Sequence, residues 1–240
     1  MGKYSFTTKA GLRMPKRSSG QEAREQKTKP DSNFEKSISS HTKATNPNFV
    51  ESFRRGDDRY TENCANCTYA FEARMRGESV EAASASRKMM TGGWRDAMEG
   101  QQWTKLYGAN GSETYSDLEK FMRAQGPNAR FAIQYLHDSG GGHIMNAIND
   151  ANGNPRFIDA QIGAELSKND MITVFNRAVH SDNRPHMITT RRRRDGEWVN
   201  VERMTHGASG VPQVSRIDNL EFNKDYRKYW DSSKRRNQGY

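Results

Sequence analysis

The decisive stretch of this 240-residue chain is Asn63-Cys64-Ala65-Asn66-Cys67-Thr68-Tyr69-Ala70-Phe71, which holds both of its cysteines. Asn63 is a favourable N-cap, and apolar residues then recur at helical spacing as far as Met75, until Gly77 offers a C-terminal stop. This pattern predicts one buried helix of about 13 residues that begins at the first cysteine. A helix N-terminus stabilises a thiolate through its unpaired N–H groups and its dipole. The stretch therefore indicates a cysteine nucleophile.

Other roles for a Cys-x-x-Cys pair fit the rest of the chain less well. A structural zinc site needs four ligands, and the six histidines are scattered with no second Cys/His pair at short spacing. A thioredoxin-like redox pair follows a strand, but residues 53–62 are charged and not strand-like. Burial as a small apolar residue stays open for one of the two thiols, since free cysteine is often fully buried.

Charge divides the chain into three parts. Residues 1–60 carry 13 Lys and Arg against 7 Asp and Glu, residues 61–165 carry 10 against 13, and residues 166–240 carry 15 against 9. The net charge of +9 thus lies on two basic flanks around an acidic middle. Such flanks suit nucleic acid, an anionic membrane face or an acidic protein.

Three segments are expected from composition. Residues 1–46 are polar with few apolar residues and predict an extended basic arm. Residues 47–165 form the folded core, and residues 166–240 form a basic C-terminal extension with a β-rich segment and a docking tail. The run Arg191 to Arg194 predicts the approach to a hairpin turn. The chain has no apolar run of 18 residues, so no membrane span is expected.

Within the core, residues 114–124 predict a second amphipathic helix, and residues 129–137 alternate as a strand does. Residues 140–148 and 156–159 flank the turn cluster 149–154, which is a strong hairpin signal. If the turn is centred near residue 151, His143 and Asp159 lie directly opposite each other or one position out of register.

Together with Cys64, these two side chains form a set of nucleophile, base and orienting acid. His143 would take the proton of the thiol, and Asp159 would fix the imidazole tautomer and stabilise the imidazolium. A backbone N–H at the helix start could bind the oxyanion.

Several local motifs resemble the papain-fold toxin family of glutamine deamidases over residues 60–165. They are Asn63-Cys64-x-x-Cys67, Arg74-x-Arg76-Gly77-x-x-Val80-x-Ala82, Gly126-Pro127-x-Ala129-Arg130, Gly142-His143-x-x-Asn146 and Asp159-x-Gln161-x-Gly163. The version with Arg-x-Arg-Gly looks most like the branch found in phage and prophage minor head proteins.

The resemblance implies an α+β fold with a papain-like cysteine hydrolase core, in which the catalytic helix packs on an antiparallel sheet between extended basic arms. It implies a nucleophile, a general base and an orienting acid, with four site-supporting residues, no metal and no cofactor. The implied nucleophile is Cys64, the general base is His143 and the orienting acid is Asp159. The implied supporting residues are Asn63, Cys67, Asn146 and Gln161. Ala160 departs from the family, which often has proline there.

Two questions stay open at this point. Cys67-Thr68-Tyr69-Ala70-Phe71 is similar to the run around the papain nucleophile and would favour Cys67, whereas the helix terminus favours Cys64, which we prefer. A papain-like protease would use the same three side chains as a deamidase.

The expected function is deamidation of a protein with a reactive glutamine by a protein made in the bacterial cytoplasm and carried in a virion or delivered into a target cell. The alternative is a structural minor head protein of a phage, whose basic arms bind capsid subunits or DNA.

Overall fold

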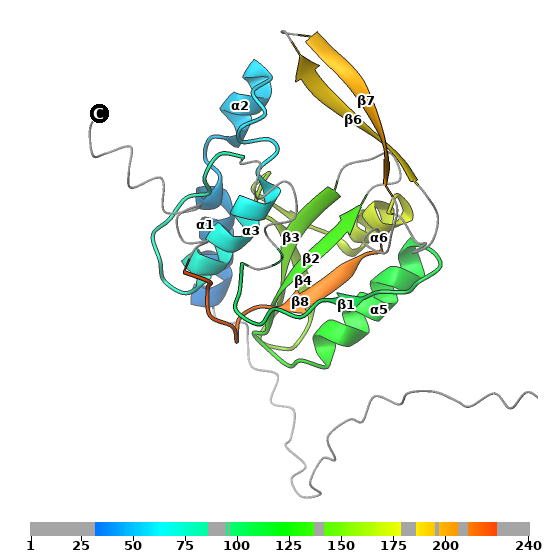
Figure 1. Ribbon diagram of the computed structural model, residues 1–240. Coiled ribbons are helices and arrows are strands. Elements are labelled where there is room, and N and C mark those ends of the chain that lie inside the picture. The colour runs from blue at the N-terminus through cyan, green and yellow to red at the C-terminus, as the bar shows by residue number, and fades with distance from the viewer. Residues whose placement is uncertain are drawn as a thin grey trace, which may run out of the picture.

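The computed structural model describes residues 32–85, 95, 97–136, 142–178, 186–194, 197–205 and 211–224. Its centre is a six-stranded antiparallel sheet in the order β1-β8-β2-β3-β4-β5 (Figure 1). The strands are β1 (Thr104–Lys105), β2 (Arg130–Leu136), β3 (Gly142–Asn149), β4 (Pro155–Asp159), β5 (Ala164–Leu166) and β8 (Gln213–Arg216). The mixture of helices with an antiparallel sheet is the predicted α+β class.

Helices cover both faces of this sheet. They are α1 (Ser32–Thr45), α3 (Cys64–Met75), α5 (Gly111–Arg123) and α6 (Lys168–Asn176), and the short helix α2 (Phe49–Arg55) follows α1 in the chain. Figure 1 shows α1 and α3 on one side of the sheet and α5 and α6 on the other. The two predicted core helices are confirmed as α3 and α5, with α5 starting three residues earlier than expected because Asn110 caps it through Glu113 N–H.

The core has one half on each side of the sheet because successive strand residues point to opposite faces. Phe131 and Ile133 of β2 pack with α5 and α6, whereas Ala132 between them packs with α1 and α3. Both faces of the sheet are therefore covered at β2, where five consecutive residues are buried.

The hairpin between β3 and β4 exists, but its register differs from the predicted one. Asn149 pairs with Pro155 and Asn146 with Ile158, so the turn is centred on Asn152 rather than on Ala151. The reason is local: the carboxylate of Asp150 accepts the N–H groups of residues 152 and 154 at 2.8 and 2.7 Å, and Gly153 takes a φ of 80°. His143 and Asp159 are consequently diagonal neighbours rather than directly opposed.

The expectation of an extended arm over residues 1–46 is wrong for its last part. Residues 32–45 form α1, whose Ile38 is 1% exposed and belongs to the core half that contains α3. A segment with few apolar residues becomes ordered here because one of them fits a site made by a helix distant in sequence. Residues 1–31 lie outside the described residues.

The C-terminal extension also contributes to the core. β5 ends the sheet on one side, and β8 lies between β1 and β2, so the expected boundary at residue 165 divides one sheet. The expected hairpin is present as β6 (His186–Arg194) and β7 (Glu197–Thr205), with the arginine run at the end of β6. The proposed docking tail at 226–240 lies outside the described residues.

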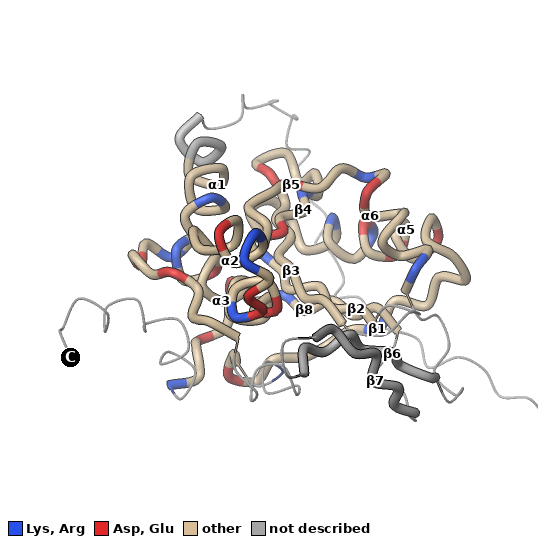
Figure 2. Tube along the Cα trace, turned by 90° about the horizontal axis from the view of Figure 1, so that it is seen from above, with Lys and Arg blue, Asp and Glu red and all other residues tan. Residues whose placement is uncertain are grey.

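A buried ion triad ties α3 to the sheet at the end away from the cysteines. Glu72 is fully buried, and its carboxylate contacts Arg76 at 2.7 Å and Arg130 of β2 at 2.8 Å. Arg76 also donates to the carbonyls of Ile217 and Leu220, just beyond β8. Figure 2 shows basic and acidic positions side by side along α3. The motif around Arg76 is thus explained by packing.

Replacing Glu72 tests the weight of this triad. Because Glu72→Gln leaves two arginines partly buried without their counter-charge, we expect it to lower the free energy of unfolding by about 3 kcal/mol or more. Glu119→Gln is the matched control, since it removes an (i, i+4) pair with Arg123 on the surface and should cost about 0.5 kcal/mol or less. Urea unfolding measures both, and equal losses would contradict the role of the triad.

Candidate active site

The helix α3 begins with the two cysteines in different environments. Cys64 is partly exposed, whereas Cys67, one turn deeper, is 1% exposed. Burial, together with the negative charges of Cys64 and Asp159, raises the pKa of the Cys67 thiol well above its usual range. A thiol that resists ionisation is a poor nucleophile, so the geometry favours Cys64.

Asn63 directly precedes α3 but does not cap it as predicted. Within the described chain, its side chain makes no capping hydrogen bond to the helix and donates instead to the carbonyl of Ala83 at 3.0 Å. Asn66 in the first turn donates to the carbonyls of Ala83 and Ser84 at 3.1 and 2.8 Å. The two amides thus fix the start of α3 to the segment after the helix.

His143 and Asp159 meet through a short hydrogen bond. Nε2 of His143 lies 2.9 Å from Oδ2 of Asp159, and the two side chains are 15% and 10% exposed. The thiol of Cys64 lies close enough to the imidazole to contribute a hydrogen-bond interaction to the pKa of His143. Since Nε2 faces the carboxylate, Nδ1 is the nitrogen left to exchange a proton with the sulfur. The structure therefore brings the three predicted catalytic side chains together.

The charges of this set reinforce one another. Burial alone would lower the pKa of His143, but the charge and hydrogen bond of Asp159, with the hydrogen bond to Cys64, raise that pKa well above its usual range. Burial would raise the pKa of Asp159, but the imidazolium and the backbone N–H groups of Gln161 and Ile162 lower it. The favoured state is an imidazolium beside a carboxylate.

Two polar contacts fix α3 on β3 next to this set. Thr68 donates its hydroxyl to the carbonyl of Ile144 at 3.1 Å, and Asn146 donates its amide to the carbonyl of Thr68 at 3.0 Å. Both residues are buried. Asn146, expected to support the site, thus acts on the helix rather than on the histidine.

Gln161, the last of the expected supporting residues, bridges two loops. Its N–H donates to Oδ1 of Asp159 at 3.1 Å, and its side-chain amide donates to the carbonyl of Thr61 at 2.9 Å. It therefore holds the acid and the segment that leads into α3 at the same time.

Sequence reasoning missed Thr68, Asn66 and Tyr135. The Tyr135 ring packs against His143 with centroids 5.8 Å apart, and the two residues are cross-strand partners in β2 and β3. That pairing follows from the hairpin, so the alternating strand and the glycine run before His143 could have indicated it. Thr68 and Asn66 offer no local signal, because their partners lie elsewhere in the chain.

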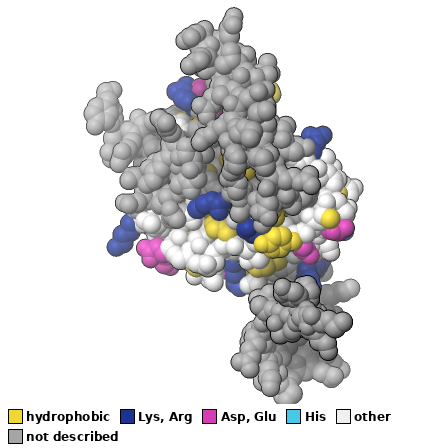
Figure 3. Space-filling model, turned by 45° about the vertical axis from the view of Figure 1, so that its right-hand side comes forward, with side chains coloured by type: hydrophobic (Ala, Val, Ile, Leu, Met, Phe, Trp, Pro, Cys, Tyr) yellow, Lys and Arg dark blue, Asp and Glu magenta, His cyan; other side chains and the backbone are white. Residues whose placement is uncertain are grey.

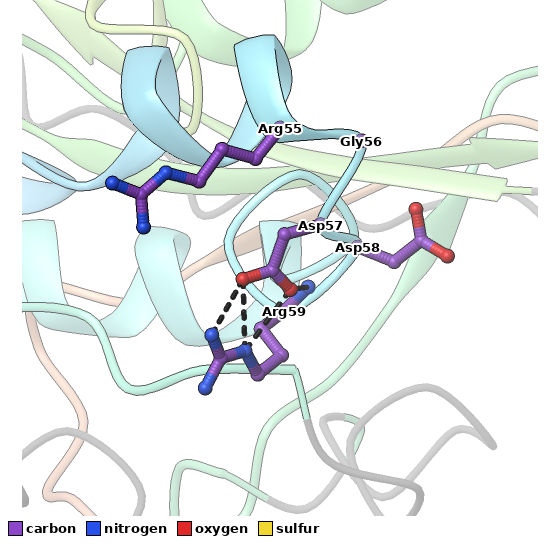
Figure 4. Close-up of a pocket in the computed structure, with 5 residues that line it drawn as sticks. All are labelled: Arg55, Gly56, Asp57, Asp58 and Arg59. Carbon is purple, nitrogen blue, oxygen red and sulfur yellow. Dashed lines mark hydrogen bonds and ion pairs between the residues drawn. The ribbon is translucent and has the colours of Figure 1, made fainter. Parts of the chain in front are cut away.

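A separate pocket lies around the end of α2 and is lined by Arg55, Gly56, Asp57, Asp58 and Arg59. Figure 4 shows the Arg59 guanidinium on the Asp57 carboxylate, a contact of 2.6 Å whose hydrogen bonds lower the pKa of Asp57 to about 2. This carboxylate is already paired, and none of the three catalytic candidates lines the pocket.

Among the described residues, no group of three or more His, Cys, Asp or Glu side chains is placed to hold a metal ion, and no helix is long and apolar enough for a bilayer. On the face seen in Figure 3, the described hydrophobic, basic and acidic side chains are intermixed. The large apolar side chains exposed in the described part of the chain are Val50, Phe53, Tyr107 and Ile162.

The histidine pKa tests the pairing of His143 with Asp159. In the wild type we expect His143 to titrate above the ordinary 6.5, and in Asp159→Asn its pKa should fall, because burial then acts without the carboxylate. The imidazole proton signal in NMR, identified by its loss in His143→Ala, measures this change.

The same pair makes stability depend on pH. The raised pKa of His143 adds stability that is complete below about 6.5 and is lost as pH rises through the folded-state value. The lowered pKa of Asp159 adds stability above about 3.8, lost as pH falls through its folded-state value. The unfolding free-energy difference between wild type and Asp159→Asn should thus be largest between about pH 4 and 6.5 and shrink above it. A constant difference up to pH 9 would contradict the pairing.

Part of the chain matches a known protein family. Residues 62–164 match the family described as papain fold toxin 1, glutamine deamidase. Searches of curated proteins and of solved structures find no match to the chain. The matched segment covers less than half of the chain and contains Cys64, His143 and Asp159. It supports the assignment of this part of the protein to the papain-fold toxin family of glutamine deamidases.

Proposed function

We propose that the protein is a cysteine-dependent amidohydrolase that converts glutamine side chains of a target protein to glutamate. The observation that carries this proposal is the position of His143, which hydrogen-bonds Asp159 through Nε2 and lies close enough to Cys64, at the start of α3, for the thiol to raise the pKa of the imidazole. This is the arrangement that thiol-based acyl transfer needs. The family match of residues 62–164 supports glutamine as the substrate side chain.

The reaction follows from the proton that His143 holds. The sulfur of Cys64 attacks the carboxamide carbon while its proton resides on the imidazole. The imidazolium then donates that proton to the nitrogen of the tetrahedral intermediate. The intermediate collapses, ammonia departs, and a thioester between Cys64 and the substrate remains. Water next gives a proton to His143 and its oxygen to the acyl carbon. The thiolate leaves, and glutamate and the starting enzyme are formed.

The negative oxygen of each intermediate needs donors. The N–H groups of the first turn of α3 point toward the N-terminal end of the helix, and Asn63 does not cap them. The Cys64 N–H is the donor that we assign to the oxyanion, since it is attached to the attacking residue. Ile162, 45% exposed and three residues after the last residue of β4, offers an apolar contact for a protein substrate.

Carriage in a phage particle stays a prediction. The motif that suggested it, Arg74-x-Arg76-Gly77, has packing contacts here: Arg76 in the triad with Glu72, and Arg74 with the carbonyl of Val80 at 2.6 Å. We likewise propose that the basic flanks bind capsid proteins or nucleic acid and that the protein is delivered into a target cell. Copurification with virions would support carriage, and absence from purified particles would contradict it.

The activity is tested on a lysate of bacterial proteins as substrate. Wild-type enzyme should release ammonia and convert particular glutamines to glutamate, a gain of about one dalton per site in mapped peptides. Cys64→Ala should abolish both signals because it removes the nucleophile. Cys67→Ala, a buried control, should keep the chemistry. New peptide N-termini without ammonia would instead identify a protease.

A further inference from the structure

Asn46 lies just beyond the C-terminal end of α1, 16 residues before the segment that matches the family. It is 6% exposed, and its side chain points into the junction between α1, the loop before α3 and the turn after β4. Because it has no part in the proposed chemistry, its burial among catalytic loops requires an explanation.

The side-chain amide of Asn46 donates to three acceptors. Nδ2 lies 2.9 Å from the carbonyl of Tyr60, 2.9 Å from the carbonyl of Gln161 and 3.3 Å from Oδ1 of Asn63. A carboxamide has two hydrogens, so the two short bonds to main-chain carbonyls take them, and the longer contact to Asn63 shares one. The Asn46 amide thus connects the segment before Cys64 with the segment after Asp159.

One end of this bridge is joined to the catalytic set through the chain, and the other through a hydrogen bond. Tyr60 lies four residues before Cys64, and Asn63 is the residue that precedes it. On the other side, the N–H of Gln161 binds the Asp159 carboxylate while its carbonyl accepts from Asn46. A shift of Gln161 would therefore move the donor that orients Asp159.

The end of α1 supports the same two loops through its backbone. The carbonyl of Thr45 accepts the N–H of Ala82 at 2.7 Å, next to the carbonyl that binds Asn63. A Cβ built on Gly163, whose φ is +72°, would lie 3.9 Å from the backbone of Thr42 and Lys43. The turn after β4 thus packs closely against the last turn of α1.

We propose that Asn46 is a positioning residue for the catalytic set and that α1, outside the matched family segment, is part of the catalytic domain. By holding the loops of Cys64 and Asp159 at a fixed separation, Asn46 keeps Cys64 within reach of His143 while Asp159 binds the same imidazole. This inference refines the proposed function and rests on it.

The residue must be an amide donor for this purpose. In Asn46→Asp, a carboxylate of the same shape would face the carbonyl oxygens of Tyr60 and Gln161 and repel them. Asn46→Ala removes the bridge, and Asn46→Ser leaves a hydroxyl that can donate to one acceptor only. If Asn46 bridges the two loops, the reactivity of Cys64 should be highest in the wild type, lower in Asn46→Ser, and lowest in Asn46→Ala and Asn46→Asp.

Asn149 provides a matched control. It is also a buried asparagine whose Nδ2 donates to two main-chain carbonyls, those of Met122 and Gly126, at 2.6 and 2.7 Å. It lies six residues from His143 along β3, about 20 Å away. Asn149→Asp therefore makes the same chemical change and should destabilise the fold without touching the catalytic loops.

The experiment measures two properties of the full-length protein that need no substrate: the rate at which iodoacetamide alkylates Cys64, and the NMR pKa of His143. Both are measured under conditions where circular dichroism shows that each variant is folded. The alkylation rate of His143→Ala gives the value expected without activation of Cys64. In Asn46→Asp and Asn46→Ala the rate should fall about tenfold or more and the pKa should move toward 6.5. Asn46→Ser should lie between them and wild type, and Asn149→Asp within about twofold of wild type.

Wild-type values in Asn46→Ala would overturn the proposal. An equal loss in Asn149→Asp would also overturn it, because the effect would then be one of general stability. Failure of the proposed function is a separate outcome: a wild-type protein whose Cys64 reacts in a His143-dependent way but which deamidates no protein would refute the deamidase and leave the positioning role intact.

Discussion

The contact between α3 and β3 is the constraint on which the site depends. A nucleophile on a helix and a base on a strand meet only if the helix cannot slide along the sheet. Thr68 and Asn146 prevent such sliding, because each donates to a main-chain carbonyl in a buried interface. A shift of one helical residue would leave these polar groups without partners, at a cost of about 1–3 kcal/mol each. The position of Cys64 beside His143 is therefore a consequence of core packing.

The same helix separates reactivity from stability along its length. Its N-terminal turn holds a partly exposed thiol and first-turn N–H groups that its preceding residue does not cap, which suit an anionic intermediate. The helix is buried from Ala65 to Ala73, and its last turns hold the Glu72 triad, which joins it to β2 and to the chain after β8. Two arginines on one carboxylate fix that end of the helix. The N-terminal end can therefore keep a reactive thiol and uncapped N–H groups, which do not stabilise the fold.

The elements with local signals were predictable, and those with distant partners were not. The helix at Cys64 has its apolar spacing and its C-terminal stop at Gly77 nearby in the sequence, and the hairpin at 149–154 has its turn residues within a few positions. The hairpin register was wrong by two because the Asp150 carboxylate and Gly153 move the turn centre. α1 and β8 were missed as parts of the core, since Ile38 and Val214 become buried only against elements far away in sequence. Within the site, Cys64, His143 and Asp159 followed from motifs, whereas Asn46 depends on a carbonyl 115 residues away.

The central claim is that Cys64, activated by His143, is the group that attacks a glutamine side chain. The most direct measurement is to treat the full-length protein with a chloroketone analogue of glutamine, which reacts with a thiolate that can bind a glutamine side chain, and to map the adduct by mass spectrometry. The account predicts one adduct, on Cys64, which is lost in His143→Ala. An adduct on Cys67, or labelling of Cys64 that is unchanged without His143, would contradict it.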